Sequence, residues 1–280
     1  MEPSEHIRIE RASGVGILTI DRPERFNSLD VRTAQDLRKA GLQLARDEAV
    51  RVVVLRGQPG AFCSGADLKY IRDGGNDADL GFLKPAARAV PRGYGEVFKQ
   101  ILEYLHSTIS EIRRSPKPWI AAVDGSAGAG GLGLALSCDL VIASERSTFE
   151  WAYNRTGLTG AESSTFFLPR LTGLRFAMEM VLLNPRLNAQ QALEARLITS
   201  VSPTNGFDAE VLAVARKIAD GATRSYGVTK ALLNQAAGLD RLDFHLDQEL
   251  EHLVRAADGP EFAEGLRAFF EKRPPNFRQG

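Results

Sequence analysis

The most hydrophobic part of the sequence, residues 119–143, limits the possible folds more than any other stretch. It is about long enough to cross a bilayer as a helix. However, Asp124, Ser126, Ser137 and Asp139 interrupt it, and glycines crowd its middle. Because charged groups are costly inside a membrane, a buried strand, a glycine-rich loop and a buried helix explain the pattern better.

Shorter apolar runs predict a body in which strands and helices alternate. The predicted strands are residues 7–10, 16–20, 52–55, 119–123 and 140–143. Asp30 can cap a helix whose apolar positions repeat at helical spacing. A second helix is predicted over residues 96–114, before Pro116. Residues 73–95, rich in glycine, aspartate and proline, predict a long loop.

The pattern changes after about residue 205, where nearly every stretch favours helix. The chain is therefore predicted to have an α/β body over residues 1–205 and a helical segment over residues 206–280. Apolar stripes on these helices need a partner surface, which predicts an oligomerisation segment; the stripe residues are Val211, Val214, Ile218 and Leu232.

Composition excludes several classes of partner. The 280 residues carry 35 basic and 35 acidic side chains, so bulk charge supports neither a nucleic-acid nor an anionic-membrane partner. Cys63 and Cys138 lie far apart without metal-ligand spacing, and we expect no metal site. Residues 1–10 are polar and lack the apolar core of a signal peptide, so we expect a cytoplasmic protein.

Two segments, residues 60–68 and 125–133, each combine a strand, a turn of small residues and the start of a helix. Asp67 is expected in the first turn of the first helix, where the helix dipole favours a carboxylate. The amide of Ala66 would point out of that helix end, and the amide of Gly130 out of the second. Two such amides that converge on one oxygen form an oxyanion hole.

The order of these segments resembles the crotonase family, also called the enoyl-CoA hydratase/isomerase family. The motifs that carry the resemblance are Arg22-Pro23, Asn27-Ser28-Leu29, residues 62–68, residues 121–125, Gly130-Gly131, residues 137–140, Gly157-Leu158, residues 168–171, Glu264-Gly265 and residues 269–273. The resemblance covers essentially the whole chain. It implies a spiral of ββα repeats, a helical C-terminal trimerisation segment, and a homotrimer or a dimer of trimers.

The resemblance also implies an acyl-coenzyme A substrate and no cofactor beyond the coenzyme A of that substrate. It assigns the oxyanion hole to Ala66 and Gly130. It assigns coenzyme A contacts to Phe269 and Lys272, which usually reach a neighbouring subunit. Arg25, in the turn after Arg22-Pro23, together with Ala66 and Asp67, completes the expected coenzyme A contacts.

The usual catalytic carboxylates of the family are missing. Hydration of an enoyl thioester needs two carboxylates, and the corresponding positions are Gly133 and Tyr153. The aspartate of many isomerases of the family falls on Ala161. We therefore expect isomerase-type or related enolate chemistry rather than standard hydration.

Three residues remain as catalytic candidates. Glu162 follows the isomerase position directly, and it could reach the pocket or be a residue at a helix N-terminus. Tyr153 could donate a hydrogen bond or form a pocket wall, or simply pack beside Trp151. His106 could activate water near neutral pH, or serve a structural role on its helix.

Two other functions are compatible with the sequence. Residues 128–133 satisfy the dinucleotide-binding pattern G-x-G-x-x-G, which would suit an NAD-binding oxidoreductase. That reading leaves residues 62–68 unexplained and ranks below an acyl-CoA protein. The absence of the usual carboxylates also suits a non-catalytic homologue that only binds acyl-CoA or acts as a scaffold.

Overall fold

The computed structural model describes residues 4–76, 78–79 and 93–279. Of the loop predicted over residues 73–95, positions 77 and 80–92 lie outside the described residues.

The strands form two sheets. The larger sheet has the order β1-β2-β3-β5-β7-β10: β1 (Ile7–Ala12), β2 (Val15–Ile20), β3 (Val52–Gly57), β5 (Trp119–Val123), β7 (Leu140–Ser144) and β10 (Ser200–Ser202). The smaller sheet has the order β4-β6-β8-β9: β4 (Gly60–Cys63), β6 (Gly125–Gly128), β8 (Thr148–Glu150) and β9 (Leu187–Asn188).

Three consecutive strand pairs, β3–β4, β5–β6 and β7–β8, repeat one arrangement. The first strand of each pair joins the larger sheet, and the second joins the smaller sheet. In the larger sheet β3, β5 and β7 run parallel to one another, and in the smaller sheet β4, β6 and β8 do so. Gly125 makes one of these transfers possible, because it has φ +103° and a Cβ there would lie 2.3 Å from the carbonyl oxygen of Gly60. The predicted spiral of ββα repeats is confirmed.

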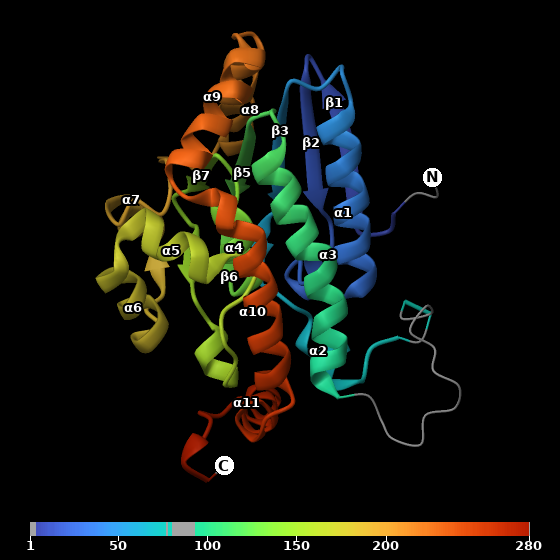
Figure 1. The fold of residues 1–280 in the computed structure, drawn as a ribbon, viewed down its shortest axis with the longest axis vertical. Coiled ribbons are helices and arrows are strands. Elements are labelled where there is room, and N and C mark those ends of the chain that lie inside the picture. The colour runs from blue at the N-terminus through green and yellow to red at the C-terminus, as the bar shows by residue number, and fades with distance from the viewer. Residues whose placement is uncertain (1–3, 77, 80–92, 280) are drawn as a thin grey trace.

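Helices cover both faces of the larger sheet. On one face α1, α3 and α10 run side by side, with α3 between the other two (Figure 1). The helices are α1 (Val31–Arg46), α2 (Leu68–Arg72), α3 (Tyr94–Arg114), α4 (Gly130–Leu136), α5 (Ser164–Thr172), α6 (Leu174–Leu183), α7 (Ala189–Glu194), α8 (Phe207–Ala219), α9 (Thr223–Ala236), α10 (Leu242–Ala257) and α11 (Pro260–Glu271). Short 3-10 turns are η1 (Pro23–Arg25), η3 (Tyr153–Thr156), η4 (Leu239–Arg241) and η5 (Phe277–Gln279).

The predicted helix limits are close to the observed ones. The Asp30 side chain accepts a hydrogen bond of 2.8 Å from the backbone N–H of Thr33, so the predicted cap is confirmed. The helix predicted over residues 96–114 begins two residues earlier, at Tyr94, and ends at Arg114 as expected.

The first helix of the C-terminal segment packs on the other face of the larger sheet. Phe207, Val211 and Ala215 of α8 lie against apolar residues of β2, β3, β5 and β7. The strand predicted over residues 52–55 is therefore buried on both faces, as expected. One expectation needs correction: Val211 is buried within its own chain and needs no partner subunit.

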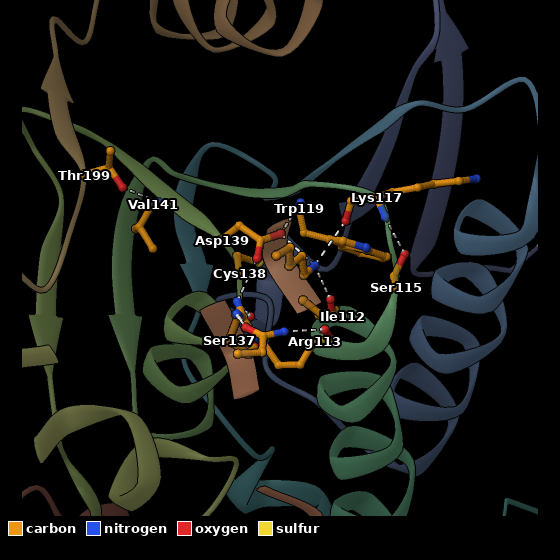
Figure 2. Close-up of polar contacts among 12 residues, drawn as sticks. Ile112, Arg113, Ser115, Lys117, Trp119, Ser137, Cys138, Asp139, Val141 and Thr199 are labelled. Carbon is orange, nitrogen blue, oxygen red and sulfur yellow. Dashed lines mark hydrogen bonds and ion pairs between the residues drawn. The ribbon is translucent and has the colours of Figure 1, made fainter. Parts of the chain in front are cut away.

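A half-buried ionic cluster fastens α9 to the body. Asp139 accepts hydrogen bonds from Arg113 and from the backbone of Trp119, each 2.8 Å long (Figure 2). The ammonium group of Lys230 contacts Asp139 at 2.8 Å and the carbonyl oxygen of Ile112 at 2.7 Å. These contacts fix α9 while leaving its other face free.

Large apolar side chains remain exposed on α6 and α9. Leu232, of the predicted stripe, is 60% exposed. The other exposed apolar residues of these two helices are Leu174, Met178, Leu182, Leu183, Tyr226, Val228 and Leu233. Among the residues that the structure describes, no helix is both long and apolar enough to cross a membrane.

Candidate active site

A cavity of about 560 Å³ opens where the parallel strands of the smaller sheet end. Ala66, Gly130 and Tyr153 follow the ends of β4, β6 and β8, and all three line it. Ligands of α/β proteins usually bind beyond the carboxyl ends of parallel strands. Further lining side chains that the sequence analysis did not propose as site residues include Lys69, Phe98, Arg155, Leu158, Arg186 and Phe270.

The backbone directs the amide of Ala66 toward this cavity. Leu29 donates to the carbonyl of Gly65 at 2.8 Å and accepts from the amide of Asp67 at 2.9 Å. In an extended chain successive amides point in opposite directions, so the N–H of Ala66 points away from Leu29. Within the described part of the chain it has no backbone acceptor.

Gly130 supplies the second amide. It is the first residue of α4, and the first amides of a helix have no acceptor within the helix. The two segments approach closely, because a Cβ at Gly65 would lie 3.0 Å from the amide nitrogen of Gly130. Ala66 and Gly130 thus both line the cavity, and among the described residues neither amide has a backbone acceptor; the oxyanion hole that the resemblance implies here stays a prediction.

The glycines of α4 allow close packing against neighbouring protein segments. A Cβ at Gly131 would lie 2.0 Å from the carbonyl oxygen of Cys63. At Gly133 it would lie 2.0 Å from the carbonyl oxygen of Glu162, and at Gly130 2.7 Å from Oε1 of Glu162. Two glycines of the dinucleotide-binding pattern, Gly130 and Gly133, are therefore explained by contacts within the protein, whereas a Cβ at Gly128 would meet nothing within 4 Å.

Glu162 lies in a turn before α5, with its carboxyl group buried at the cavity wall. It is 2% exposed, and α5 begins only at Ser164, so Glu162 is not part of the helix. Glu162 and Ser163 have φ values of 51° and 63°, in the left-handed region that few residues other than glycine adopt. The Tyr153 hydroxyl donates a hydrogen bond to Oε2 of Glu162.

Burial controls the ionisation of both side chains. Removal from water raises the pKa of Glu162 to about 8; the Tyr153 hydrogen bond opposes this rise and the charge of Glu249 adds to it. Burial, together with the nearby Glu162 carboxylate, raises the pKa of Tyr153 well above 10, so the phenol keeps its proton. Glu162 can accordingly exchange a proton near neutral pH, while Tyr153 remains a donor.

His106 lies behind this turn and does not line the cavity. Its Nε2 accepts a hydrogen bond of 3.2 Å from the backbone amide of Glu162. Burial lowers the pKa of His106 to about 4, so the ring is neutral and can accept that bond. His106 thus contacts the backbone of Glu162 and lies outside the cavity lining.

The residues expected to contact coenzyme A line the cavity, with the exception of Lys272. Arg25 and Phe269 line it, and Phe269 does so within its own chain, because α11 packs against η3. Asp67 also lines it, but it caps α2 instead of lying in the first turn, and it forms ion pairs with Arg22 and Arg25. Lys272 follows α11 and is exposed outside the cavity.

Comparison with known proteins agrees with this geometry. Residues 10–89 and 93–280 match the model of the enoyl-CoA hydratase/isomerase family. The chain is 30% identical to 4-chlorobenzoyl coenzyme A dehalogenase-2 of Arthrobacter sp, over 95% of this chain and 91% of that protein. It is 32% identical to 1,2-epoxyphenylacetyl-CoA isomerase of Escherichia coli strain K12, over 94% of this chain and 95% of that protein.

A solved structure shows the same fold. The crystal structure of an enoyl-CoA hydratase from Mycobacterium avium subsp. paratuberculosis K-10 is similar with a TM-score of 0.84 and 30% sequence identity. The similarity covers 98% of this chain and 99% of that one. The chain therefore belongs to the enoyl-CoA hydratase/isomerase family, the crotonase family of acyl-CoA enzymes.

Proposed function

We propose that the protein shifts a proton along the acyl chain of a coenzyme A thioester, as an isomerase or in related enolate chemistry. The observation that carries the proposal is the position of the Glu162 carboxyl group. It is buried, it lines the cavity, and its Oε1 lies where a side chain of Gly130 would be. A titratable group with a pKa near neutrality thus lies beside the proposed oxyanion hole.

The reaction would use these groups in a simple order. The Glu162 carboxylate takes a proton from the α- or γ-carbon of the acyl chain. From the α-carbon, the C–H electron pair forms a double bond to the carbonyl carbon, and the carbonyl π pair moves to the thioester oxygen. From the γ-carbon of a 2-enoyl chain, the C–H pair forms the β–γ double bond, the α–β π pair moves to the bond between the α-carbon and the carbonyl carbon, and the carbonyl π pair again moves to the oxygen. The amides of Ala66 and Gly130 would stabilise that oxyanion. Return of the proton to the other carbon shifts the double bond and restores Glu162.

Standard hydration fits this site poorly. A water molecule that adds across a double bond needs a carboxylate to orient it, and the two usual positions are Gly133 and Tyr153. Tyr153 stays protonated and is engaged with Glu162. The relatives include a named isomerase and a named dehalogenase, which supports chemistry other than hydration.

Binding of coenzyme A would use the polar side of the cavity mouth. We propose that Arg25 and Lys272 attract the phosphates, and that Ala66, Asp67 and Phe269 contact the rest of the thioester. We also propose a homotrimer or a dimer of trimers, because the exposed apolar side chains of α6 and α9 form surfaces that a second copy can cover.

The test is proton exchange at the acyl chain. A panel of 2-enoyl-, 3-enoyl- and saturated acyl-CoA thioesters in D₂O, followed by mass spectrometry, should show deuterium uptake and double-bond migration. Glu162→Gln should lower turnover at least about a hundredfold and leave acyl-CoA affinity nearly unchanged. The matched control is Glu179→Gln, at an exposed glutamate of α6.

The same assay separates an enzyme from a binding protein. Saturable acyl-CoA binding without any exchange or isomerisation across the panel would favour the non-catalytic homologue. If Glu162→Gln retains full turnover, the carboxyl group is not the base.

A further inference from the structure

The turn that carries Glu162 is held in an unfavourable backbone conformation by contacts from outside it. Glu162 and Ser163 are consecutive left-handed residues, and neither is glycine. Such residues persist only where the surrounding structure fixes them. The groups that fix this turn therefore determine where the Glu162 carboxyl group points.

Glu249 of α10 supplies most of these contacts. It is 5% exposed although it carries a charge. Its Oε2 accepts from the backbone amide of Ser163 at 2.7 Å, and its Oε1 accepts from the amide of Thr165 at 3.0 Å. The Thr165 hydroxyl also donates to Oε1. Both oxygens of one buried carboxylate thus hold the amide of Ser163 in the turn and two donors of Thr165, the second residue of α5.

His106 holds the other side of the same turn. Its ring accepts from the amide of Glu162, and the backbone of Leu246, on α10 near Glu249, opposes the fall in the pKa of His106. Because α3 and α10 lie side by side, the two supports form one unit (Figure 1). The helical C-terminal segment therefore reaches the active site through α10.

We propose that Glu249 is a positioning residue of the active site, whose carboxylate holds the Glu162–Ser163 turn so that the Glu162 carboxyl group faces the thioester. This inference rests on the proposed role of Glu162 as the proton carrier. It assigns a part of the active site to a residue that never touches the substrate.

The charge of Glu249 has a second effect on Glu162. Four groups face the Glu162 carboxyl or its backbone: the Tyr153 hydroxyl from η3, the neutral His106 ring from α3, the Cys63 thiol from β4, and Glu249, with His245 beside it on α10. Of these, Glu249 is the anion, and it raises the pKa of Glu162 in addition to the effect of burial. Loss of this charge should make Glu162 a stronger acid.

The experiment compares Glu249→Gln, Glu249→Asp and the control Glu251→Gln. Glutamine keeps the shape but loses the charge and one acceptor, whereas aspartate keeps the charge and is too short to span the turn. Glu251 lies on the same helix, and its side chain is 57% exposed and paired with Arg255. Circular dichroism and thermal melts identify any variant that fails to fold.

Two measurements do not depend on enzymatic activity. Hydrogen exchange should become faster at the amides of Ser163 and Thr165 in both Glu249 variants, with no change in Glu251→Gln. In infrared spectra, the band of the protonated Glu162 carboxyl group is the one that Glu162→Gln removes. Titration of this band should show a lower midpoint in Glu249→Gln only. Unchanged exchange at these amides, or an unchanged midpoint in Glu249→Gln, would overturn the proposal.

The catalytic measurement is the pH profile of turnover. Both Glu249 variants should lose about tenfold or more in kcat with little change in KM, since a hydrogen bond to a charged group is worth about that factor. Only Glu249→Gln should also move the acid limb to lower pH. A drop in rate that is equal at every pH and follows loss of folded protein would show a purely structural role.

If the wild-type protein turns over no thioester, the proposed function fails, while exchange and titration still decide whether Glu249 holds the turn.

Discussion

The Tyr153 hydroxyl donates a hydrogen bond to Oε2 of Glu162, and both side chains are buried at the cavity wall. The resemblance places Tyr153 where hydratases of the family carry a catalytic glutamate. Here the phenol instead stabilises the carboxylate of Glu162, because a hydrogen bond to the charged form favours it. Glu162, the base that we propose, thus lies nine residues beyond position 153.

Tyr153→Phe should shift the pH dependence of turnover upward. The hydrogen bond from Tyr153 lowers the pKa of Glu162, so its loss should raise that pKa above about 8. A smaller fraction of Glu162 would then be ionised at pH 7, and the rate there should fall about tenfold. A pH–rate profile between pH 6 and 10 tests this, with Tyr226→Phe, on an exposed part of α9, as control. An acid limb that stays in place or moves to lower pH would contradict it.

A hydratase carboxylate cannot be restored at position 133 without cost. A Cβ there would lie 2.0 Å from the carbonyl oxygen of Glu162, so even Gly133→Ala should destabilise the protein by about 1–3 kcal/mol. Urea denaturation measures this, and Gly128→Ala is the stability control, since its Cβ would meet nothing within 4 Å. A stability of Gly133→Ala equal to that of the wild type would show that the turn around Glu162 can move away.

The lack of carboxylates at positions 133 and 153 should make crotonyl-CoA hydration slow. Each missing general acid or base typically costs about 10² to 10⁴ in rate, and both hydratase positions lack a carboxylate. A spectrophotometric assay of crotonyl-CoA should show hydration well below about 1 per second. Faster hydration would mean that Glu162 alone activates water.

Local patterns predicted much of the fold, because caps and strand ends depend on adjacent residues. The Asp30 cap and the strand Trp119–Val123 are found where the sequence placed them. The conformation of Glu162 and Ser163 could not be predicted in this way, since neither residue favours positive φ. It depends on Glu249, which is 86 residues distant from Ser163 in the chain. In the sequence Glu249 looks like one more charged residue of a solvated helix face.

The position of Gly133 shows the same limit. From the sequence this glycine is only a missing carboxylate, whereas in the structure the backbone of Glu162 takes the space of its side chain. We therefore propose that the missing carboxylate at position 133 and the placement of the Glu162 carboxyl group are linked. Only the contact between α4 and the turn before α5 reveals it.

The exposed apolar residues of α6 and α9 predict an oligomer. Leu182 and Leu232 are 72% and 60% exposed, and a face of this kind is usually covered by another subunit. Light scattering should give a mass about three or six times the 30.5 kDa of one chain. Leu232→Asp and Leu182→Asp should lower this mass, and Gln190→Asp, at an exposed polar position of α7, should not. A wild-type monomer at micromolar concentration would contradict the prediction.

The buried carboxyl group of Glu162 should make stability depend on pH in a defined direction. Its pKa is about 8 in the folded protein and near 4.5 when exposed, so the folded state holds a proton that the unfolded state has lost between these values. The contribution of Glu162 to the free energy of unfolding is therefore greatest below about pH 4.5 and decreases as the pH rises to about 8. His106 acts in the opposite direction at lower pH, because its pKa falls from 6.5 to about 4 on folding.

Glu162→Gln isolates the contribution of Glu162, since His106 is present in both proteins. Glutamine carries no charge at any pH, so the variant should gain stability over the wild type as the pH rises from about 5 to about 8. Above pH 8 the difference should become constant. Urea denaturation at one-unit pH intervals measures it, with Glu179→Gln as the exposed control. A difference in the free energy of unfolding that does not change with pH would show that Glu162 is ionised in the folded protein throughout. The carboxyl group would then be unable to exchange a proton with the acyl chain near neutral pH.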